Sequence, residues 1–180
     1  MSKITAISGR VLYNSRGSKT IEVDVVSDEK FVGRVCAPSG ASVGKFEAVS
    51  FPNNSPEESL SILNQNSDKF IGIDASDLKQ VHDVIHSIDE TENYAKIGGA
   101  CAFAVTIAAT ESAAKAENKQ FFQMISDKND LKFPFPLGNI LGGGAHAGPG
   151  TPDIQEILVA SIGAKTGRES IDINLQVHKE

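Results

Sequence analysis

The spacing of apolar residues changes at residues 38–47, and this change constrains the fold more than any other feature. Before it, apolar and polar residues alternate with the period of two that is typical of strands with one buried face. After it, apolar residues recur three and four positions apart, as in amphipathic helices. We therefore expect an α+β fold in which strands come first and a bundle of helices follows.

The alternation is clearest at residues 20–26, where three apolar side chains face one way and two carboxylates face the other. Similar strands are predicted at residues 4–13 and 31–37. The short polar runs between them, 14–18 and 27–30, have the composition of turns. Three strands joined by short turns predict a three-stranded antiparallel meander.

The first helix has a strong start signal. Ser55 is the expected N-cap, Pro56 occupies the first helical position, and Glu58 completes a capping box. A second helix is predicted from Ser76 or Asp77, where apolar residues again follow helical spacing.

Two further helices are expected. An alanine-rich run follows Gly98 and continues to about residue 116. Because alanine favours helices and its small side chain permits close packing, we expect this helix to be the most buried. A short helix is predicted at residues 120–125.

His82 and His86 lie four positions apart on the second predicted helix, a spacing that some metal sites use. The apolar stripe lies elsewhere on that helix, and no carboxylate completes a ligand set. We therefore favour a solvated helix face over a metal site.

The composition shifts after the helices. Residues 126–130 are polar, and the alternating phenylalanines and prolines of 133–136 predict a stiff extended connector. We expect one domain at 1–126, a linker at 127–136 and the start of a second domain at 137–180.

In the second domain, residues 139–150 contain five glycines around His146. This composition suggests a mobile loop that folds over a ligand, with a plain flexible linker as the alternative. A strand is predicted at 154–160, with Gln155 and Glu156 adjacent on it, and a helix from Arg168 onward.

The segment 38–47 contains two glycines, two serines and a lysine: Ser39, Gly40, Ser42, Gly44 and Lys45. Successive backbone N–H groups in such a segment can form an anion-binding nest, and serine hydroxyls can contact a metal or phosphate. An ordinary loop between strand and helix is the alternative.

A nucleotide-binding P-loop is a poor match to this segment. Gly40 and Gly44 are separated by three residues where the motif needs four, and Phe46 occupies the position of the magnesium-binding hydroxyl.

Bulk composition excludes other classes. A net charge of −6 argues against a nucleic-acid-binding surface. The two cysteines, Cys36 and Cys101, suggest neither a disulfide scaffold nor a zinc site. No apolar run approaches the roughly 18 residues of a membrane span, and the N-terminus has no signal-peptide pattern, so we expect a cytoplasmic protein.

Four segments, taken in order, resemble the enolase family. Residues 14–25 resemble D-S-R-G-N-P-T-V-E-V, and residues 38–48 resemble P-S-G-A-S-T-G followed by E-A. Residues 91–93 resemble the end of G-T-E-N. Residues 139–156 resemble N-x-x-N-G-G-x-H-A-G followed by Q-E. Together these motifs span essentially the whole chain.

The resemblance implies a small α+β domain that leads into a β/α barrel. It also implies a hydro-lyase that interconverts 2-phosphoglycerate with phosphoenolpyruvate and water, using Mg²⁺. In enolases the serine matching Ser42 ligates the second magnesium from a mobile loop, here with Ser39, Gly40, Ala41 and Gly44.

Further roles follow from the same resemblance. The histidine matching His146 closes over the substrate, and the residues matching Gln155 and Glu156 line the substrate site. Arg16 matches a residue near the family's dimer interface, so a homo-oligomer is implied.

This sequence departs from the family pattern in places. Asn14 replaces aspartate, Val43 replaces threonine, Gly142 replaces asparagine, and the interval from His146 to Gln155 is one residue longer.

Length is the largest departure. The family's principal metal carboxylates, lysine base and proton donor lie later in the barrel, which needs roughly 200 residues or more. We therefore expect no principal acid or base here, an incomplete active site, and apolar surface exposed where the rest of the barrel would pack. The alternatives are a catalytically silent enolase-like binding or assembly module and, more remotely, a separate phosphate-binding protein that uses residues 39–45.

Overall fold

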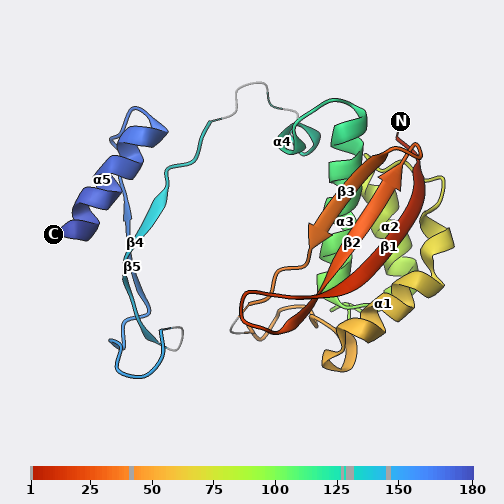
Figure 1. Cartoon of the computed structure of the whole chain (residues 1–180), viewed down its shortest axis with the longest axis horizontal. Coiled ribbons are helices and arrows are strands. Elements are labelled where there is room, and N and C mark those ends of the chain that lie inside the picture. The colour runs from red at the N-terminus through yellow and green to blue at the C-terminus, as the bar shows by residue number, and fades with distance from the viewer. Residues whose placement is uncertain (1, 41–42, 127, 129–131, 145–146) are drawn as a thin grey trace. The chain divides into compact units, whose positions relative to one another are not determined.

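The structure is a computed structural model that describes residues 2–40, 43–126, 128, 132–144 and 147–180. The chain divides into two compact units, Met1–Asp127 and Lys128–Glu180. Figure 1 shows that the first unit contains a sheet and most of the helices, whereas the second contains a long hairpin and one helix.

Three antiparallel strands form the sheet of the first unit: β1 (Ile4–Tyr13), β2 (Lys19–Ser27) and β3 (Phe31–Cys36). The predicted meander is confirmed. Ile21, Val23 and Val25 of β2 are fully buried on one face, as their alternation requires. Val25 lies opposite Ile7 of β1 and Gly33 of β3, so one row of the buried face crosses all three strands.

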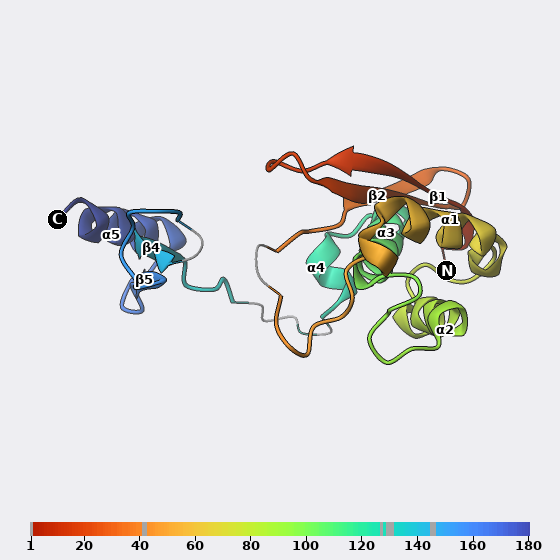
Figure 2. The ribbon, with the colours of Figure 1, turned by 90° about the horizontal axis from the view of Figure 1, so that it is seen from below.

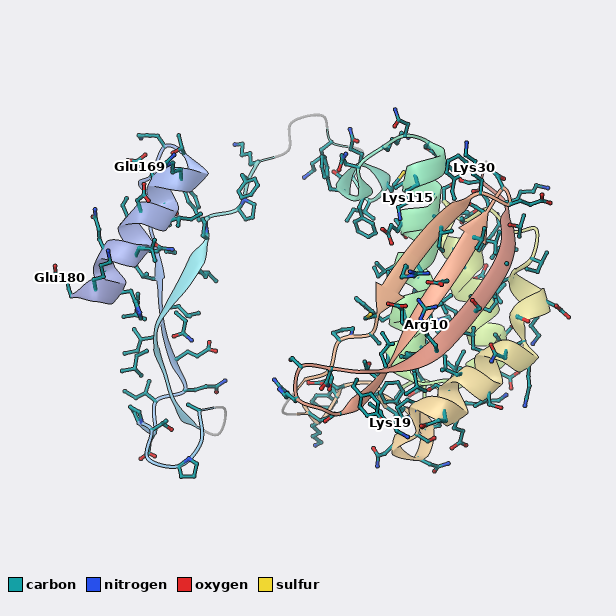
Figure 3. All side chains as sticks on the ribbon, viewed as in Figure 1. Arg10, Lys19, Lys30, Lys115, Glu169 and Glu180 are labelled. Atoms are coloured by element: carbon teal, nitrogen blue, oxygen red, sulfur yellow. The ribbon has the colours of Figure 1, made fainter. Side chains whose placement is uncertain are left out.

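The opposite face of the sheet carries a charged cluster. Asp24 Oδ2 accepts from Arg10 Nη1 at 3.0 Å, and Asp24 Oδ1 accepts from Arg34 Nε at 2.7 Å. Arg10 also pairs with Glu22. Figure 3 shows the Arg10 side chain lying over the strands. Hydrogen bonds from Arg34 and Arg10 outweigh the effect of partial burial and hold the pKa of Asp24 below its usual value of 3.8.

The helices cover the apolar face of this sheet (Figure 2). The longest, α3, packs against β2 and β3, whereas α1 packs mainly against β1. Their bounds, with those of the short 3₁₀ helices, are η1 (Pro52–Asn54), α1 (Pro56–Gln65), η2 (Ser67–Phe70), α2 (Leu78–Asp89), α3 (Gly99–Ala116) and α4 (Phe121–Met124). The alanine-rich helix is the most buried of these, as predicted.

Helix α3 approaches β3 so closely that only glycine fits at residue 33. A Cβ added to Gly33 would lie 1.9 Å from the carbonyl oxygen of Ala108 and 2.6 Å from the backbone nitrogen of Ser112. Ser112 Oγ lies 2.6 Å from Ser27 Oγ and donates to the carbonyl oxygen of Phe31 at 2.8 Å. These bonds satisfy buried hydroxyls inside a tightly packed contact.

The start of α1 confirms half of the predicted capping box. Ser55 Oγ accepts from the backbone N–H of Glu58 at 3.1 Å. The reciprocal bond is absent, because the N–H of Ser55 donates instead to the carbonyl oxygen of Pro52. The Glu58 carboxylate accepts from the side-chain amide of Asn53, which has a positive φ of 49°.

The start of α3 is also fixed by glycine geometry. Gly98, its N-cap, has a φ of +89°. A Cβ at this position would lie 2.6 Å from the carbonyl oxygen of Ser50 and 2.8 Å from Ser59 Oγ. The segment around Ser50 therefore lies directly against the first turn of α3.

The second unit consists of β4 (Leu137–Gly142), β5 (Glu156–Ala160) and α5 (Gly167–Lys179). Residues 139–142, predicted to begin a loop, form the last four residues of β4, and the strand predicted from 154 begins at Glu156. The two strands pair antiparallel, unlike the parallel strands of a regular β/α barrel.

Polar contacts hold α5 to this hairpin. Ser161 Oγ donates to the carbonyl oxygen of Ser170 at 3.0 Å and lies 3.1 Å from Asn174 Oδ1. Asn174 Nδ2 donates to the carbonyl oxygen of Pro136 at 2.9 Å. We call Ser161, Ser170 and Asn174 the polar cluster.

Apolar side chains of the second unit remain accessible. Leu137, Ile157 and Leu175 are 67%, 46% and 52% exposed, and no apolar side chain among the described residues after 128 is buried. The predicted exposure of apolar surface is therefore confirmed for this unit.

The charged cluster predicts a pH-dependent contribution to stability. Because folding lowers the pKa of Asp24, its contribution is present above pH 3.8 and lost as the pH falls through the lower folded-state pKa. Asp24→Asn should lower the free energy of unfolding at pH 7 by about 1–2 kcal/mol, since it removes charge-assisted hydrogen bonds. Urea unfolding between pH 7 and pH 2.5 measures this effect, with Glu92→Gln as an exposed control. A difference from the parent chain that stays constant down to pH 2.5 would contradict the assignment.

The contact at Gly98 predicts a second stability effect. Gly98→Ala should destabilise the fold by about 2–5 kcal/mol, because it adds left-handed backbone strain to a clash with Ser50 and Ser59. Gly72→Ala is the matched control: its φ is +85°, but an added Cβ meets nothing within 4 Å. Thermal and urea unfolding should show a clearly larger loss for Gly98→Ala, and equal losses would argue against the close contact.

Candidate functional site

The segment 38–47 leaves β3 and reaches solvent. Its described residues are exposed, and Phe46 is 93% exposed. Glu47 closes a small turn, because its carboxylate accepts from the N–H of Gly44 at 2.8 Å and its own N–H donates back to the carbonyl oxygen of Gly44 at 3.2 Å. Lys45 Nζ lies 5.5 Å from the centre of the Phe46 ring.

The predicted loop residues divide by what the structure describes. Ser39, Gly40 and Gly44 are exposed. Ala41 and Ser42, the predicted metal ligand, lie outside the described residues. The geometry of the described parts is that of a solvent-exposed connection with a Gly44–Glu47 turn.

The main chain is fixed on both sides of this segment. On the strand side, the N–H of Ala37 donates to the carbonyl oxygen of Ile21, and Thr20 Oγ1 donates to the carbonyl oxygen of Ala37 at 2.9 Å. On the helix side, the carbonyl oxygen of Val49 accepts from the N–H of Gly99 at 2.7 Å. The carbonyl oxygen of Ser50 accepts from Ala100 at 3.2 Å. The segment is thus anchored by hydrogen bonds at Ala37 on one side and at Val49 and Ser50 on the other, as is common for functional loops.

No local sequence pattern predicts this support. In the sequence, Gly98 precedes an alanine-rich helix, and a glycine at a helix start is the only signal of this contact. Its contact with Ser50 depends on the tertiary fold and has no local sequence pattern.

A cavity of about 410 Å³ lies beside this support. It is lined by both flanks of the segment and by α2 and α3, with Pro38, Glu47, Ser50, His82, Tyr94 and Phe103 among its walls. His82 and His86 are both exposed on α2. Each Nε2 faces a hydroxyl: Thr106 Oγ1 lies 3.5 Å from His82 and Tyr94 Oη lies 3.4 Å from His86.

The predicted substrate residues of the second unit lie at the end of its hairpin. Gln155 precedes β5 and Glu156 begins it, and both are exposed. The carbonyl oxygen of Gln155 accepts from the N–H of Gly143 at 2.8 Å. His146 lies outside the described residues.

Glycine is needed where this hairpin end closes. A Cβ at Gly143 would lie 2.4 Å from the carbonyl oxygens of both Pro152 and Ile154. Glycine at this position therefore allows the main chain of residue 143 to lie close to that of residues 152–154.

Arg16 lies at the tip of the turn between β1 and β2 and is exposed. Asn14 Oδ1 accepts from the N–H groups of Arg16 and Ser18 at 2.9 and 3.0 Å. Asparagine thus supplies the acceptor that organises this turn, a role that the aspartate of the enolase pattern also suits.

The described residues do not form a magnesium centre. No group of three or more His, Cys, Asp or Glu side chains comes together among them in an arrangement that could hold a metal ion. Mg²⁺ prefers six oxygen ligands with carboxylates among them, and a single serine hydroxyl supplies one. Within the described chain, no helix is both long enough and apolar enough to span a membrane.

Known proteins give a consistent picture of this chain. A family model described as "Enolase, N-terminal domain" matches residues 4–125. The Enolase of Methanothermobacter thermautotrophicus is 40% identical over 179 residues, which cover 99% of this chain and 43% of the relative. The Enolase of Methanosphaera stadtmanae is 39% identical over the same proportions, and that of Halorubrum lacusprofundi is 37% identical over 99% of this chain and 44% of the relative.

The chain spans less than half the length of these relatives. The family model nevertheless covers most of the chain, and it coincides with the strands and helices of the first unit. The resemblance seen in the four sequence segments is confirmed: this chain belongs to the enolase family.

Proposed function

We propose that this chain supplies the N-terminal domain and the opening of the barrel of an enolase. The reaction is the interconversion of 2-phosphoglycerate with phosphoenolpyruvate and water in glycolysis. The observation that carries the proposal is the match to enolases along the whole chain together with the family's N-terminal domain at residues 4–125. The glycolytic reaction also makes the cytoplasm the proposed location.

The chemistry explains what such an enzyme needs. Dehydration removes a weakly acidic proton beside a carboxylate and expels hydroxide from the neighbouring carbon. The intermediate gains negative charge, and enolase-type enzymes pair a base with one or two Mg²⁺ ions that stabilise it. We assign no residue of this chain as the base.

The contribution of this chain is its two loop regions. We assign Ser42 as one magnesium ligand, on the segment that also contains Ser39, Gly40, Ala41 and Gly44. We assign His146, Gln155 and Glu156 to the substrate. Because the described residues form no metal centre, the remaining magnesium ligands and the acid–base groups belong to protein outside this chain in the proposal.

The exposed apolar surface of the second unit supports the proposal that further protein packs against it. Apolar side chains of β4, β5 and α5 remain accessible, and a soluble protein rarely leaves so many together. We propose that the remaining part of the barrel covers them. We also propose that Arg16, at its exposed turn, contributes to a homo-oligomer interface.

The alternative function is a module that has the enolase fold but does not catalyse the enolase reaction. The departures from the enolase loop patterns, Val43 in the first loop and Gly142 in the second, favour a catalytically silent binding or assembly module. Such a module would give no turnover in any combination, and measurable magnesium-dependent binding of 2-phosphoglycerate would count against it.

Turnover of 2-phosphoglycerate separates the two functions. The 180-residue chain alone should be inactive with magnesium. A chimera that joins it to the rest of the Methanothermobacter thermautotrophicus enolase should be active. Ser42→Ala in the chimera should lower activity by at least about tenfold, since a metal contact is lost. Ser61→Ala, an exposed serine on α1, is the control.

Two outcomes would overturn the proposal. A folded chimera that is inactive, beside an active relative, would favour the silent module. Turnover by the 180-residue chain alone would show that a base and metal ligands exist within it.

A further inference from the structure

We propose that Asp89 is a positioning residue that fixes the support of the segment 38–47. The inference rests on the proposed function, in which this segment contacts magnesium. Asp89 contacts neither the segment nor any residue assigned to substrate. It acts through the turn at residues 90–97, which joins α2 to α3.

The Asp89 carboxylate is the centre of this turn. It is the last residue of α2 and only 1% exposed. One oxygen accepts from the N–H and the hydroxyl of Thr91, with the N–H at 3.0 Å. The other accepts from the N–H groups of Lys96 and Ile97 at 3.0 and 2.6 Å. Both ends of the turn are therefore tied to one side chain.

The turn at residues 90–97 is hydrogen-bonded to the support of the segment 38–47. The carbonyl oxygen of Asn93, inside the turn, accepts from the N–H of Val49 at 2.9 Å. The carbonyl oxygen of Tyr94 accepts from the N–H of Gly98 at 2.8 Å. Gly99 then donates to Val49, as described above. Val49 is thus bonded on one side to the turn and on the other to the first residue of α3.

Further contacts join this turn to the core. The hydroxyl of Ser59 on α1 donates to the carbonyl oxygen of Ile97 at 2.7 Å, and Ile97 is fully buried. Thr91 Oγ1 accepts from the N–H of Ala95 at 2.8 Å. Glu90 and Tyr94 both have a positive φ, at 59° and 58°, so the turn's backbone has a shape that needs outside support.

The charge of Asp89 suits this role. Burial raises the pKa of the carboxyl, but hydrogen bonds from Thr91, Ile97 and Lys96 outweigh burial and lower it below 3.8. A carboxylate at the C-terminus of a helix opposes the helix dipole. An acidic residue here therefore carries a local cost, which the four donors of the turn offset.

Variants at two positions test the role. Asp89→Asn keeps the size of the side chain but presents an amide donor to main-chain donors. Thr91→Val is milder, since it removes only the hydroxyl that joins Asp89 to Ala95, and it serves if Asp89→Asn fails to fold. Val25→Ala is the control: it destabilises the core at the sheet, which lies outside this network.

Trypsin gives a local readout at the segment itself. Lys45 is the only lysine or arginine between Arg34 and Lys69, so peptides that end at Lys45 or begin at Phe46 report cleavage in this segment alone. A protease binds several residues of extended chain on both sides of the bond, so opening of the bonds at Val49, four residues after Lys45, should speed the cleavage. Asp89→Asn should speed cleavage at Lys45 by about 10- to 100-fold, from the loss of buried hydrogen bonds.

Amide exchange identifies the bonds that open. Exchange at Val49, Gly99 and Ala100 should accelerate in Asp89→Asn and Thr91→Val. In Val25→Ala, exchange and cleavage should change only as far as its global stability does. If the Asp89 and Thr91 variants behave like Val25→Ala at matched stability, Asp89 merely stabilises the fold and the inference is overturned.

The active chimera tests the functional consequence. Asp89→Asn should raise the Mg²⁺ concentration needed for half-maximal turnover by about tenfold, whereas Val25→Ala should leave it unchanged. An unchanged magnesium requirement would also overturn the inference. If no combination shows turnover but cleavage at Lys45 accelerates as expected, the proposed reaction fails while the structural role of Asp89 stands.

Discussion

The first unit depends on how closely α3 approaches β3. Gly33 allows the carbonyl of Ala108 to lie where any larger residue would place its Cβ. Because α3 is rich in alanine, its own side chains are also small, and the helix can pack close to the sheet. The same helix begins at Gly99, after its N-cap Gly98. The first turn of α3 then holds Val49 and Ser50. A single helix thus makes both the close contact with the sheet and the hydrogen bonds at the base of the exposed segment.

Much of this fold was predictable, because its elements carry their periodicity in local sequence. The alternation at β2 and the N-cap at Ser55 both lie within a few residues and act locally. The missed features depend on distant partners. Glu58 accepts from Asn53 rather than closing the capping box, because the backbone at Asn53 brings its amide close. Strand β4 extends into the glycine-rich run 139–150, and only its pairing with β5 shows that the first four residues of the run are extended.

The site was predictable to a smaller extent. The family motifs predict Gln155 and Glu156, whose surroundings the structure describes, and Ser42 and His146, which lie outside the described residues. All four assignments stay predictions. Neither Asp89 nor the contact at Gly98 was predicted from sequence. An acidic residue at a helix C-terminus, two positions before a threonine, was a usable signal for Asp89. What it binds, four donors on one turn, follows only from the folded backbone.

The polar cluster of the second unit has a consequence for biosynthesis. The first unit completes its apolar core with residues that precede 128. Domains generally fold as units as the chain emerges from the ribosome, so this unit can fold while later residues are still being made. The hairpin and α5 are held by Ser161, Ser170 and Asn174, with their apolar side chains still facing water. During synthesis the second unit is therefore more vulnerable to chaperone capture and aggregation than the first, and its exposed apolar side chains are what chaperones would bind.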